Sequence, residues 1–397
     1  MLTGKGDSPQ YVLNNLDPER LRAARERAGI TGRRLAELVG KTPSAISQFE
    51  SGTTLPDLDT LVRLSMALGV PTTFFARRTG HVSVPFDRCH FRARRSVSQR
   101  DRRGSVRDGE ILLGLVNALA AKGVVFPEEQ LSTFRERRSP VTDVDDLEAA
   151  ERAAMELRRH WGMGTGPVPH LVRLMESKGV FVFPLADAHV DVDAYSAWAG
   201  GRPCIMLAMA KTASRARFDA AHELAHLILH DDIDPGAATV ERQADRFAGA
   251  FLAPRESFLM ECPRRWSLPA FERLKDRWHL SVQALVRRGF DLGCLSQASY
   301  QRAFRDLSML GLRRDEGPEW DHEQPTLLDQ ALGLLKGQID LDELASELGL
   351  YPADLEGLLR RNAEEATILA IKKPRAEETA PLIWLDRGAS PQGHALS

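Results

Sequence analysis

The chain has 397 residues, of which 43% are apolar and 27% are charged, and this composition indicates an ordinary water-soluble protein with two or three domains. No apolar run approaches the ~18 residues needed to cross a bilayer, the amino terminus has no hydrophobic signal core, and Cys89, Cys204, Cys262 and Cys294 are scattered. These features argue against a membrane protein, a secreted protein and a disulfide framework, so we expect a cytoplasmic protein.

The net charge of −2 conceals an asymmetry along the chain. Residues 17–107 contain 18 Lys and Arg against 9 Asp and Glu, which is a charge of +9. Residues 1–16 are neutral, so residues 108–397 carry −11. A basic front joined to an acidic body predicts that only the front meets nucleic acid.

Residues 1–16 are polar and have little to bury, so we predict a flexible leader. The next stretch, residues 17–80, has the apolar spacing of four short helices. The first helix ends at Gly29, the second is capped by Thr31, and the third is capped by Thr42. Short helices joined by tight turns predict an all-α domain of the helix-turn-helix type.

The stretch from Ala45 to Gly52, Ala-Ile-Ser-Gln-Phe-Glu-Ser-Gly, resembles the recognition helix of the XRE (Cro/repressor) family. The resemblance implies that this helix enters the major groove of a double-stranded operator, where a glutamine can bond adenine bidentately. The candidate DNA contacts are Thr42, Ser44, Ala45, Ser47 and Gln48. The chain departs from the family at Gly32, where a glutamine is usual. The alternative is a helical module that binds another protein.

Residues 81–145 are expected to be a basic connector followed by a helical linker. The run from His90 to Arg103 is dense in arginine, which is typical of a solvated basic face. Its place after the DNA-binding domain also allows it to lie along phosphates, and both interpretations stay open. Helical spacing over 108–137 and a linker over 139–145 complete the segment.

The sequence His222-Glu-Leu-Ala-His226 lies in a stretch with helical apolar spacing. Histidines four residues apart share one face of a helix, so both imidazoles can reach one metal ion. Glu223 projects beside them and can take a proton from a water that the metal activates. His230 is a poor third ligand, because eight steps of ~100° turn it off the shared face. The longer pattern with a third histidine fails, because Asp232 stands in its place.

A second helix, predicted between Gly236 and Pro254, supplies the missing ligand. Within it, Glu241 and Asp245 are four residues apart and share a face. One carboxylate can bind the metal while the other holds a ligand histidine through its second ring nitrogen. Glu241 is the better candidate for the ligand. Several alanines keep this helix slim enough to pack closely on the first.

Three runs rich in β-branched and aromatic residues predict strands at 179–184, 192–198 and 204–207. A small sheet beside the metal helix would form a cleft whose edge strand can pair with an extended substrate. Tyr195 or His189 is a candidate to stabilise the oxyanion of a tetrahedral intermediate. For each of these two residues, a place in the core or in a loop is the alternative.

Two stretches, Arg215 to His226 and Glu241 to Ala248, together resemble the ImmA/IrrE family of metallopeptidases. The resemblance implies a thermolysin-like (gluzincin) zinc core over residues 146–312 and a repressor-type protein as the substrate. It also implies a role for each matching residue: metal ligands His222, His226 and Glu241, general base Glu223, and Asp245 behind a ligand histidine. Histidine with carboxylate favours Zn²⁺, with Mn²⁺ as the alternative.

Beyond this domain, residues 313–372 are expected to form a helical C-terminal region, and residues 373–397 a disordered tail. Residues 341–355 look like a second helix-turn-helix. Acidic residues stand where the phosphates of DNA would lie. We therefore expect this unit to pack against the rest of the protein or to contact a partner.

The expected fold is therefore α+β and mainly helical. The predicted function is a DNA-binding transcriptional regulator, expected to be a homodimer, with a zinc-dependent endopeptidase domain. The peptidase is expected to cleave a repressor-type protein, itself or a partner, in a stress- or phage-linked response. The alternative is a transcription factor whose metal domain is a non-proteolytic ligand sensor or a dimer scaffold. A third hypothesis is an antitoxin-type module that binds a protein partner through its acidic body.

Overall fold

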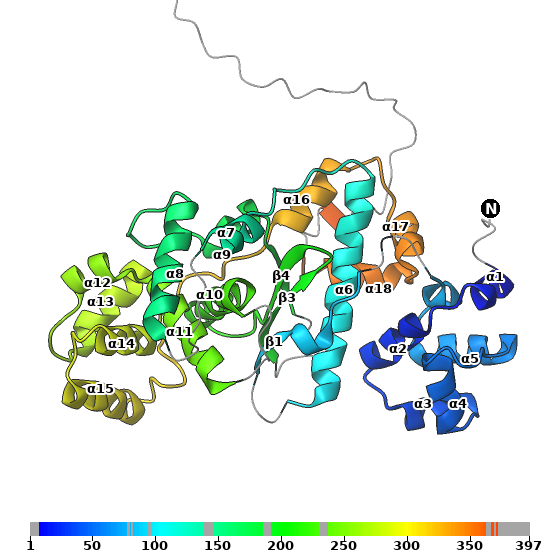
Figure 1. The fold of residues 1–397 in the computed structure, drawn as a ribbon, viewed down its shortest axis with the longest axis horizontal. Helices are drawn as coiled ribbons and strands as arrows, with labels where there is room; N and C mark the ends of the chain where they lie inside the picture. The colour runs from blue at the N-terminus through cyan, green and yellow to red at the C-terminus, as the bar shows by residue number, and fades with distance from the viewer. Residues whose placement is uncertain are drawn as a thin grey trace, which may run out of the picture.

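The computed structural model of the protein describes residues 8–77, 80, 82–93, 97–138, 146–185, 192–230, 237–362, 367–368 and 371. Helices dominate these residues and the strands form one mixed sheet, which confirms a mainly helical α+β protein. Figure 1 shows the N-terminal helices at one end, the sheet in the middle, and helices α12 (Arg255–Glu261) to α15 (Gln297–Met309) at the other end. No helix in the described part of the chain is long and apolar enough to cross a membrane.

The N-terminal domain contains the four predicted helices. They are α2 (Pro18–Arg27), α3 (Gly32–Val39), α4 (Pro43–Glu50) and α5 (Leu58–Leu68), followed by the 3-10 turn η1 (Thr72–Phe75). The side chains of Asp17, Thr31 and Thr42 accept hydrogen bonds from first-turn amides, as N-cap residues do. Gly40 ends α3 at a φ of 66°, a left-handed conformation that glycine adopts without a Cβ clash.

The prediction that residues 1–16 form a flexible leader is wrong for the described residues 8–16. These residues include a short helix, α1 (Pro9–Asn14), whose Val12 is fully buried. Leu16 is also buried and forms a β-bridge with the end of the same domain. Val12 and Leu16 both join the apolar core of the domain, which a count of polar residues over the segment cannot reveal.

All three predicted strands are present, as β2 (Phe181–Pro184), β3 (Val192–Ala199) and β4 (Arg202–Leu207). A further strand, β1 (His90–Ala93), lies inside the arginine-rich connector, where the sequence does not predict it. The strand order is β1-β3-β4-β2. Strands β1 and β4 run antiparallel to β3, whereas β2 runs parallel to β4. The residues of β1 carry little β signal, so this strand depends on the partner that β3 offers.

The predicted connector is part of the folded body and not a spacer. Its long helix α6 (Gln99–Ala121) begins inside the arginine run and contacts β3 on one face of the sheet (Figure 1). Three ion pairs tie α6 to α2: Arg27 to Asp108 at 2.9 Å, and Arg107 and Arg103 to Glu26 at 2.8 Å and 3.5 Å. The prediction of one helical stretch over 108–137 is therefore wrong at its start, because Ser98 caps the helix earlier.

Helices cover the opposite face of the sheet. Helix α10 (Ala213–Leu229) contacts β3 and β4 and packs against α11 (Ala238–Leu252), which in turn packs on α8 (Leu147–His160). The other helices of this part are α7 (Leu131–Arg137), α9 (Leu171–Ser177), α12, α13 (Leu268–Trp278), α14 (Val282–Asp291) and α15. Helix α10 is buried on nearly all sides, as expected of a helix between a sheet and other helices.

The sheet separates two apolar cores. Successive side chains of a strand point to opposite faces, so Phe181 and Phe183 of β2 join one core while Val182 joins the other. The first core runs without a break from the N-terminal helices through α6 to the C-terminal helices. The second core contains α8, α10 and α11. The N-terminal domain and the α10 side are thus built on the two faces of one sheet.

The C-terminal region is helical, with α16 (Leu327–Leu334), α17 (Leu341–Leu348) and α18 (Pro352–Leu359). Lys122 of α6 forms ion pairs of 2.8 Å with Glu343 and Glu347 of α17. The acidic second helix-turn-helix therefore packs on α6, in agreement with the packing role expected from the sequence. The predicted disordered tail, residues 373–397, lies outside the described residues.

The burial of Val12 in α1 leads to a prediction about the stability of the N-terminal domain. Val12→Ala should lower the free energy of unfolding of the N-terminal domain by about 2 kcal/mol, because two methyl groups leave a fully buried site. Gln10→Ala, on the exposed face of the same helix, should change it by less than about 0.5 kcal/mol. Urea unfolding followed by circular dichroism measures both. Equal stability of the two variants would show that α1 is not held by Val12.

Candidate metal centre

Two packed helices carry the candidate metal ligands. Helix α10 presents His222 and His226 one turn apart on the same face, as the helical repeat requires. Helix α11 presents Glu241 in its first turn. Ala244 and Ala248 of α11 are fully buried, and their small side chains allow the two helices to approach closely. The structure thus brings together all three residues that the sequence proposes as ligands.

The ligand atoms of these residues converge on one point. The Nε2 atoms of His222 and His226 are 3.0 Å apart, and the Glu241 carboxylate oxygens lie 3.3 Å and 3.7 Å from them. Two nitrogens and a carboxylate at these separations fit the bonds of about 2.0–2.2 Å that zinc forms. Both imidazoles are almost completely buried, whereas the Glu241 side chain is 36% exposed. The centre is therefore open on the Glu241 side, where a further ligand of the metal ion can bind.

Asp245 contacts the other ring nitrogen of His222. A metal on Nε2 leaves the imidazole proton on Nδ1, and His222 Nδ1 lies 2.9 Å from Asp245 Oδ1. Arg92 of β1 donates to the same carboxylate oxygen at 3.0 Å and forms a 2.8 Å ion pair with Asp219 of α10. The connector strand therefore supports the orientation of a candidate ligand. The sequence proposes Asp245 for this place but does not reveal Arg92.

A chain of hydrogen bonds supports His226 from behind. His226 Nδ1 lies 3.0 Å from His230 Nδ1, and His230 Nε2 lies 2.9 Å from the Gln243 side-chain oxygen. Because the Gln243 oxygen only accepts, the proton of His230 belongs on Nε2, and its Nδ1 accepts the proton of His226. Burial lowers the pKa of His230 to about 4, so this ring is neutral at pH 7. His230, rejected as a metal ligand, positions one instead.

Glu223 occupies a fully buried place next to the ligand histidines. Ser196 of β3 donates a hydrogen bond of 2.6 Å to its Oε2. Its other oxygen, Oε1, is buried and has no hydrogen-bond partner among the described residues. Burial raises the pKa of the Glu223 carboxyl to about 7, against the opposing effects of His222 and Ser196. Such a carboxyl can exchange a proton near neutral pH.

Tyr195 does not reach this centre. Strand residues alternate between faces, so Ser196 points to Glu223 while Tyr195 points to α6, where its hydroxyl donates to the Ser105 carbonyl at 2.9 Å. The prediction of Tyr195 as an oxyanion stabiliser is therefore wrong, and the core placement weighed against it is correct. His189, the other candidate, lies outside the described residues.

Strand β1 also contacts the residues of the candidate metal centre. The ring of His90 stacks on His226 with centroids 4.3 Å apart, and its Nε2 lies 2.9 Å from the His230 carbonyl. Because β1 pairs with β3, strand β3 lies inside the sheet. Among the described residues the two edges are β1 and β2.

The candidate DNA contacts lie together on helix α4. Thr42, Ser44, Ser47 and Gln48 are exposed, and Ala45 is half-buried. Ile46 and Phe49 face inward, and Glu50 is held by two hydrogen bonds from Arg25, at 2.6 Å and 2.8 Å. The ion pair between Arg25 and Glu50 orients α4, so that Ser44, Ser47 and Gln48 face outward.

Comparisons with known proteins agree with this geometry. Residues 175–289, which include β2 to β4 and all the candidate metal residues of α10 and α11, match the M78 peptidase family model described as "IrrE N-terminal-like domain". Residues 21–75 match the model described as "Helix-turn-helix". The chain joins an XRE-type helix-turn-helix domain to an IrrE-like domain. The IrrE-like match lies inside the expected span of 146–312.

A curated relative matches a short part of the chain. It is an SPbeta prophage-derived uncharacterized HTH-type transcriptional regulator, YonR, of Bacillus subtilis (strain 168). The two proteins are 39% identical over 69 residues, which are 17% of this chain and 63% of the relative. The match therefore covers less than two thirds of the relative and about a sixth of this chain.

Several residues that contact the candidate ligands cannot be assigned this place from the sequence alone. His90, Arg92 and Ser196 come from strands distant in the sequence, so no local spacing indicates them. His230 and Gln243 are different, because each follows a ligand on its own helix or loop by a short distance. A histidine four residues after His226 is a signal for a supporting residue, since hydrogen-bonded partners behind metal-bound imidazoles are common.

Two neighbouring residues of β3 allow a matched test of these placements. Tyr195→Phe should cost about 1 kcal/mol of stability, because it removes a buried hydrogen bond on the α6 side, and it should leave metal content and activity unchanged. Ser196→Ala should retain the metal but reduce activity, because it frees the Glu223 carboxylate. Urea unfolding, metal analysis and turnover measure the three properties. Loss of turnover in Tyr195→Phe would contradict its assignment to the α6 side.

Proposed function

We propose that this protein is a DNA-binding transcriptional regulator whose IrrE-like domain is a zinc-dependent endopeptidase with a thermolysin-like core. The observation that carries the proposal is the buried Glu223 beside His222, His226 and Glu241, with one carboxylate oxygen that has no partner in the described chain. A structural metal site requires ligands but no general base. A buried carboxylate placed against the ligands therefore favours hydrolysis over scaffolding.

His222, His226 and Glu241 would hold the metal ion. Their two nitrogens and one carboxylate are a donor set that suits Zn²⁺, with Mn²⁺ as the alternative. When bound, the ion would lower the pKa of a water molecule and polarise a peptide carbonyl. Asp245 and His230 would keep the two imidazoles in the required tautomers and orientations.

Residues of the chain would accept and donate the protons of the reaction. Glu223 Oε1 would accept a proton from the attacking water and later donate it to the leaving amine nitrogen. Ser196 would hold the other oxygen of Glu223, so that the carboxylate does not rotate away. The buried surroundings of Glu223 keep bulk water from competing for that proton.

The substrate we propose is a repressor-type protein, in cis or in trans. The geometry favours an extended segment near the sheet, since β1 already pairs with β3 beside the candidate ligands. The connector, which contains β1, is the candidate substrate in cis. A stress- or phage-linked response and a homodimeric regulator complete the proposal.

Helix α4 would read the operator. Gln48→Ala should weaken binding about tenfold, because a bidentate contact from glutamine to adenine contributes about 1–3 kcal/mol. The probe is a duplex selected by the wild-type protein from random DNA, and binding is measured by fluorescence anisotropy at fixed salt. Gln297→Ala, an exposed residue of α15 at the opposite end of the molecule, is the control and should bind normally (Figure 1). Equal affinity of Gln48→Ala and wild type would remove Gln48 from the interface.

The peptidase hypothesis is tested with three proteins: wild type, His222→Ala and Glu223→Gln. Wild type and Glu223→Gln should hold one zinc, because the glutamine keeps the size of Glu223 and lies outside the ligand set, whereas His222→Ala should lose it. Only the wild type should release its operator under inducing stress. Metal analysis of the purified proteins and operator occupancy in cells measure these outcomes.

Regulation by Glu223→Gln that equals the wild type would reject the endopeptidase. The metal domain would then be a ligand sensor or a dimer scaffold. If the wild type regulates but yields no fragment of itself under stress, cleavage in cis is rejected and a partner repressor remains the substrate. Co-purification of a stable protein partner, with no cleavage, would favour the antitoxin-type hypothesis.

A further inference from the structure

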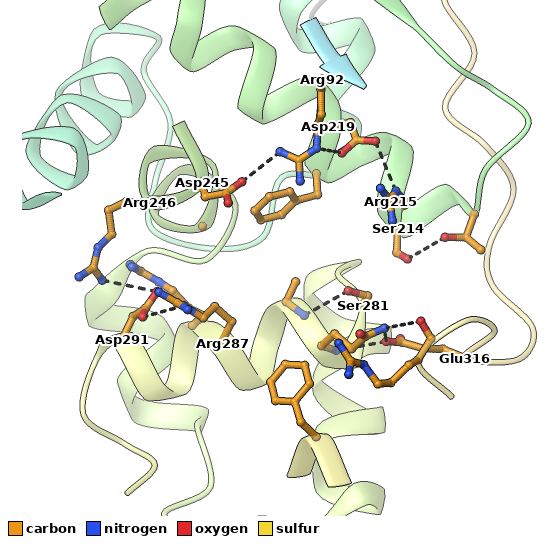
Figure 2. Close-up of a pocket in the computed structure, with 18 of the residues that line it drawn as sticks. Arg92, Ser214, Arg215, Asp219, Asp245, Arg246, Ser281, Arg287, Asp291 and Glu316 are labelled. Carbon is orange, nitrogen blue, oxygen red and sulfur yellow. Dashed lines mark hydrogen bonds and ion pairs between the residues drawn. The ribbon is translucent and has the colours of Figure 1, made fainter. Parts of the chain in front are cut away.

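A cavity of about 610 Å³ lies next to the candidate metal centre, between helices α10 and α11 on one side and α14, α15 and residues 313–319 on the other. Figure 2 shows Arg92, Asp219 and Asp245 facing Ser281 and Glu316 across this space. Asp245 and Arg92 belong to both sites, because each lines the cavity and lies within hydrogen-bonding distance of His222. Both residues contact Nδ1 of His222, so the cavity adjoins the side of that ring that faces away from the candidate metal position at Nε2.

The wall of the cavity is rich in arginine. Eight arginines and five carboxylates line it, which is an excess of three positive charges. The sign of the net charge is reversed at this wall, because residues 108–397 as a whole carry a net charge of −11. An excess of positive charge in a partly enclosed space attracts anions and concentrates them there.

The carboxylates of the wall are already bound within the protein. Asp291 pairs with Arg287 at 2.9 Å, and Asp219 and Asp245 pair with Arg92. Glu316 accepts from the first amides of α14 and lies 3.5 Å from the Lys275 ammonium. Glu319 accepts from the Ser214 amide and hydroxyl. These contacts also engage Arg92 and Arg287, so both charges of each pair largely cancel within the wall.

Two arginines at the rim are available to a ligand. Arg313 and Arg314 are exposed, and neither forms an ion pair with a carboxylate in the part of the chain that the structure describes. The guanidinium of Arg313 lies over the ring of Phe304, 5.4 Å from its centre. Phe218 and Phe304 add apolar surface to the wall. A planar guanidinium beside apolar surface suits a carboxylate on an aliphatic stem, which is the structure of glutamate and aspartate side chains.

We propose that this cavity binds acidic side chains of the peptide that enters the metal centre, so that the substrate carries a glutamate- or aspartate-rich segment beside the scissile bond. The inference rests on the proposed endopeptidase, because it assigns the occupant by the position of the cavity next to the candidate metal centre and by the arginines of its wall. The volume fits a few side chains and is in the range of about 300–1,000 Å³ usual for ligand pockets. DNA held by α4 does not reach this cavity, because the two lie at opposite ends of the molecule (Figure 1).

The test measures binding and not cleavage. Full-length Glu223→Gln loaded with zinc is titrated with a fluorescent glutamate-rich peptide and with the same peptide carrying glutamine at each glutamate. The acidic peptide should bind more tightly, and added salt should weaken its binding. Arg313→Gln combined with Arg314→Gln should raise its Kd about fivefold. Arg302→Gln combined with Arg305→Gln, which removes the same charge from exposed residues outside the cavity, should leave the Kd unchanged.

Three outcomes would overturn the inference: equal or absent binding of the two peptides, an equal effect of the two double variants, or binding of pyrophosphate without binding of the acidic peptide. The last would make the cavity a site for a small anion. All four substituted arginines are exposed, and zinc content checks that each variant is folded. Because the readout needs no hydrolysis, acidic-peptide binding by a protein that cleaves nothing would reject the endopeptidase and keep the binding site.

Discussion

The arrangement of the metal centre depends on the guanidinium of Arg92, which lies between Asp219 of α10 and Asp245 of α11. Asp219 is almost completely buried, and a buried carboxylate without a partner costs about 3–5 kcal/mol. Arg92 comes from the connector that follows the DNA-binding domain, so this one side chain joins three segments that are distant in the sequence. It holds Asp245 in the place where that residue can orient His222.

Strand β3 provides the second link between the two halves of the molecule. Its adjacent residues Tyr195 and Ser196 point to opposite faces, one to the Ser105 carbonyl of α6 and the other to Glu223. Helix α6 is in turn tied to α2 of the DNA-binding domain by ion pairs. A shift of β3 along its axis would therefore disturb both Glu223, the proposed general base, and the packing of α6. If the protein cuts its own connector at β1, the sheet loses the strand that pairs with β3. The contacts of β3 with Glu223 on one face and with α6 on the other would then both be disturbed.

The features predicted correctly from the sequence are those encoded by short spacings. His222 and His226, and Glu241 and Asp245, are four residues apart on helices, and helical geometry alone places each pair on one face. The caps Thr31 and Thr42 mark helix starts for the same local reason. Strand β1 and the contacts of Arg92 could not be predicted, because they depend on which segment pairs with β3. Tyr195 was misplaced because a residue's face on a strand requires the register of the sheet.

Three arginines of the connector form ion pairs with carboxylates of the protein. Arg92 is paired with Asp219 and Asp245, Arg107 with Glu26 and Glu110, and Arg103 lies 3.5 Å from Glu26. These arginines of the connector therefore bind the protein itself, which disfavours the hypothesis that they lie along phosphates. Arg92 would have to leave the buried Asp219, and Arg107 the buried Glu110, before either could bind DNA, and that cost exceeds the gain from an exposed phosphate contact.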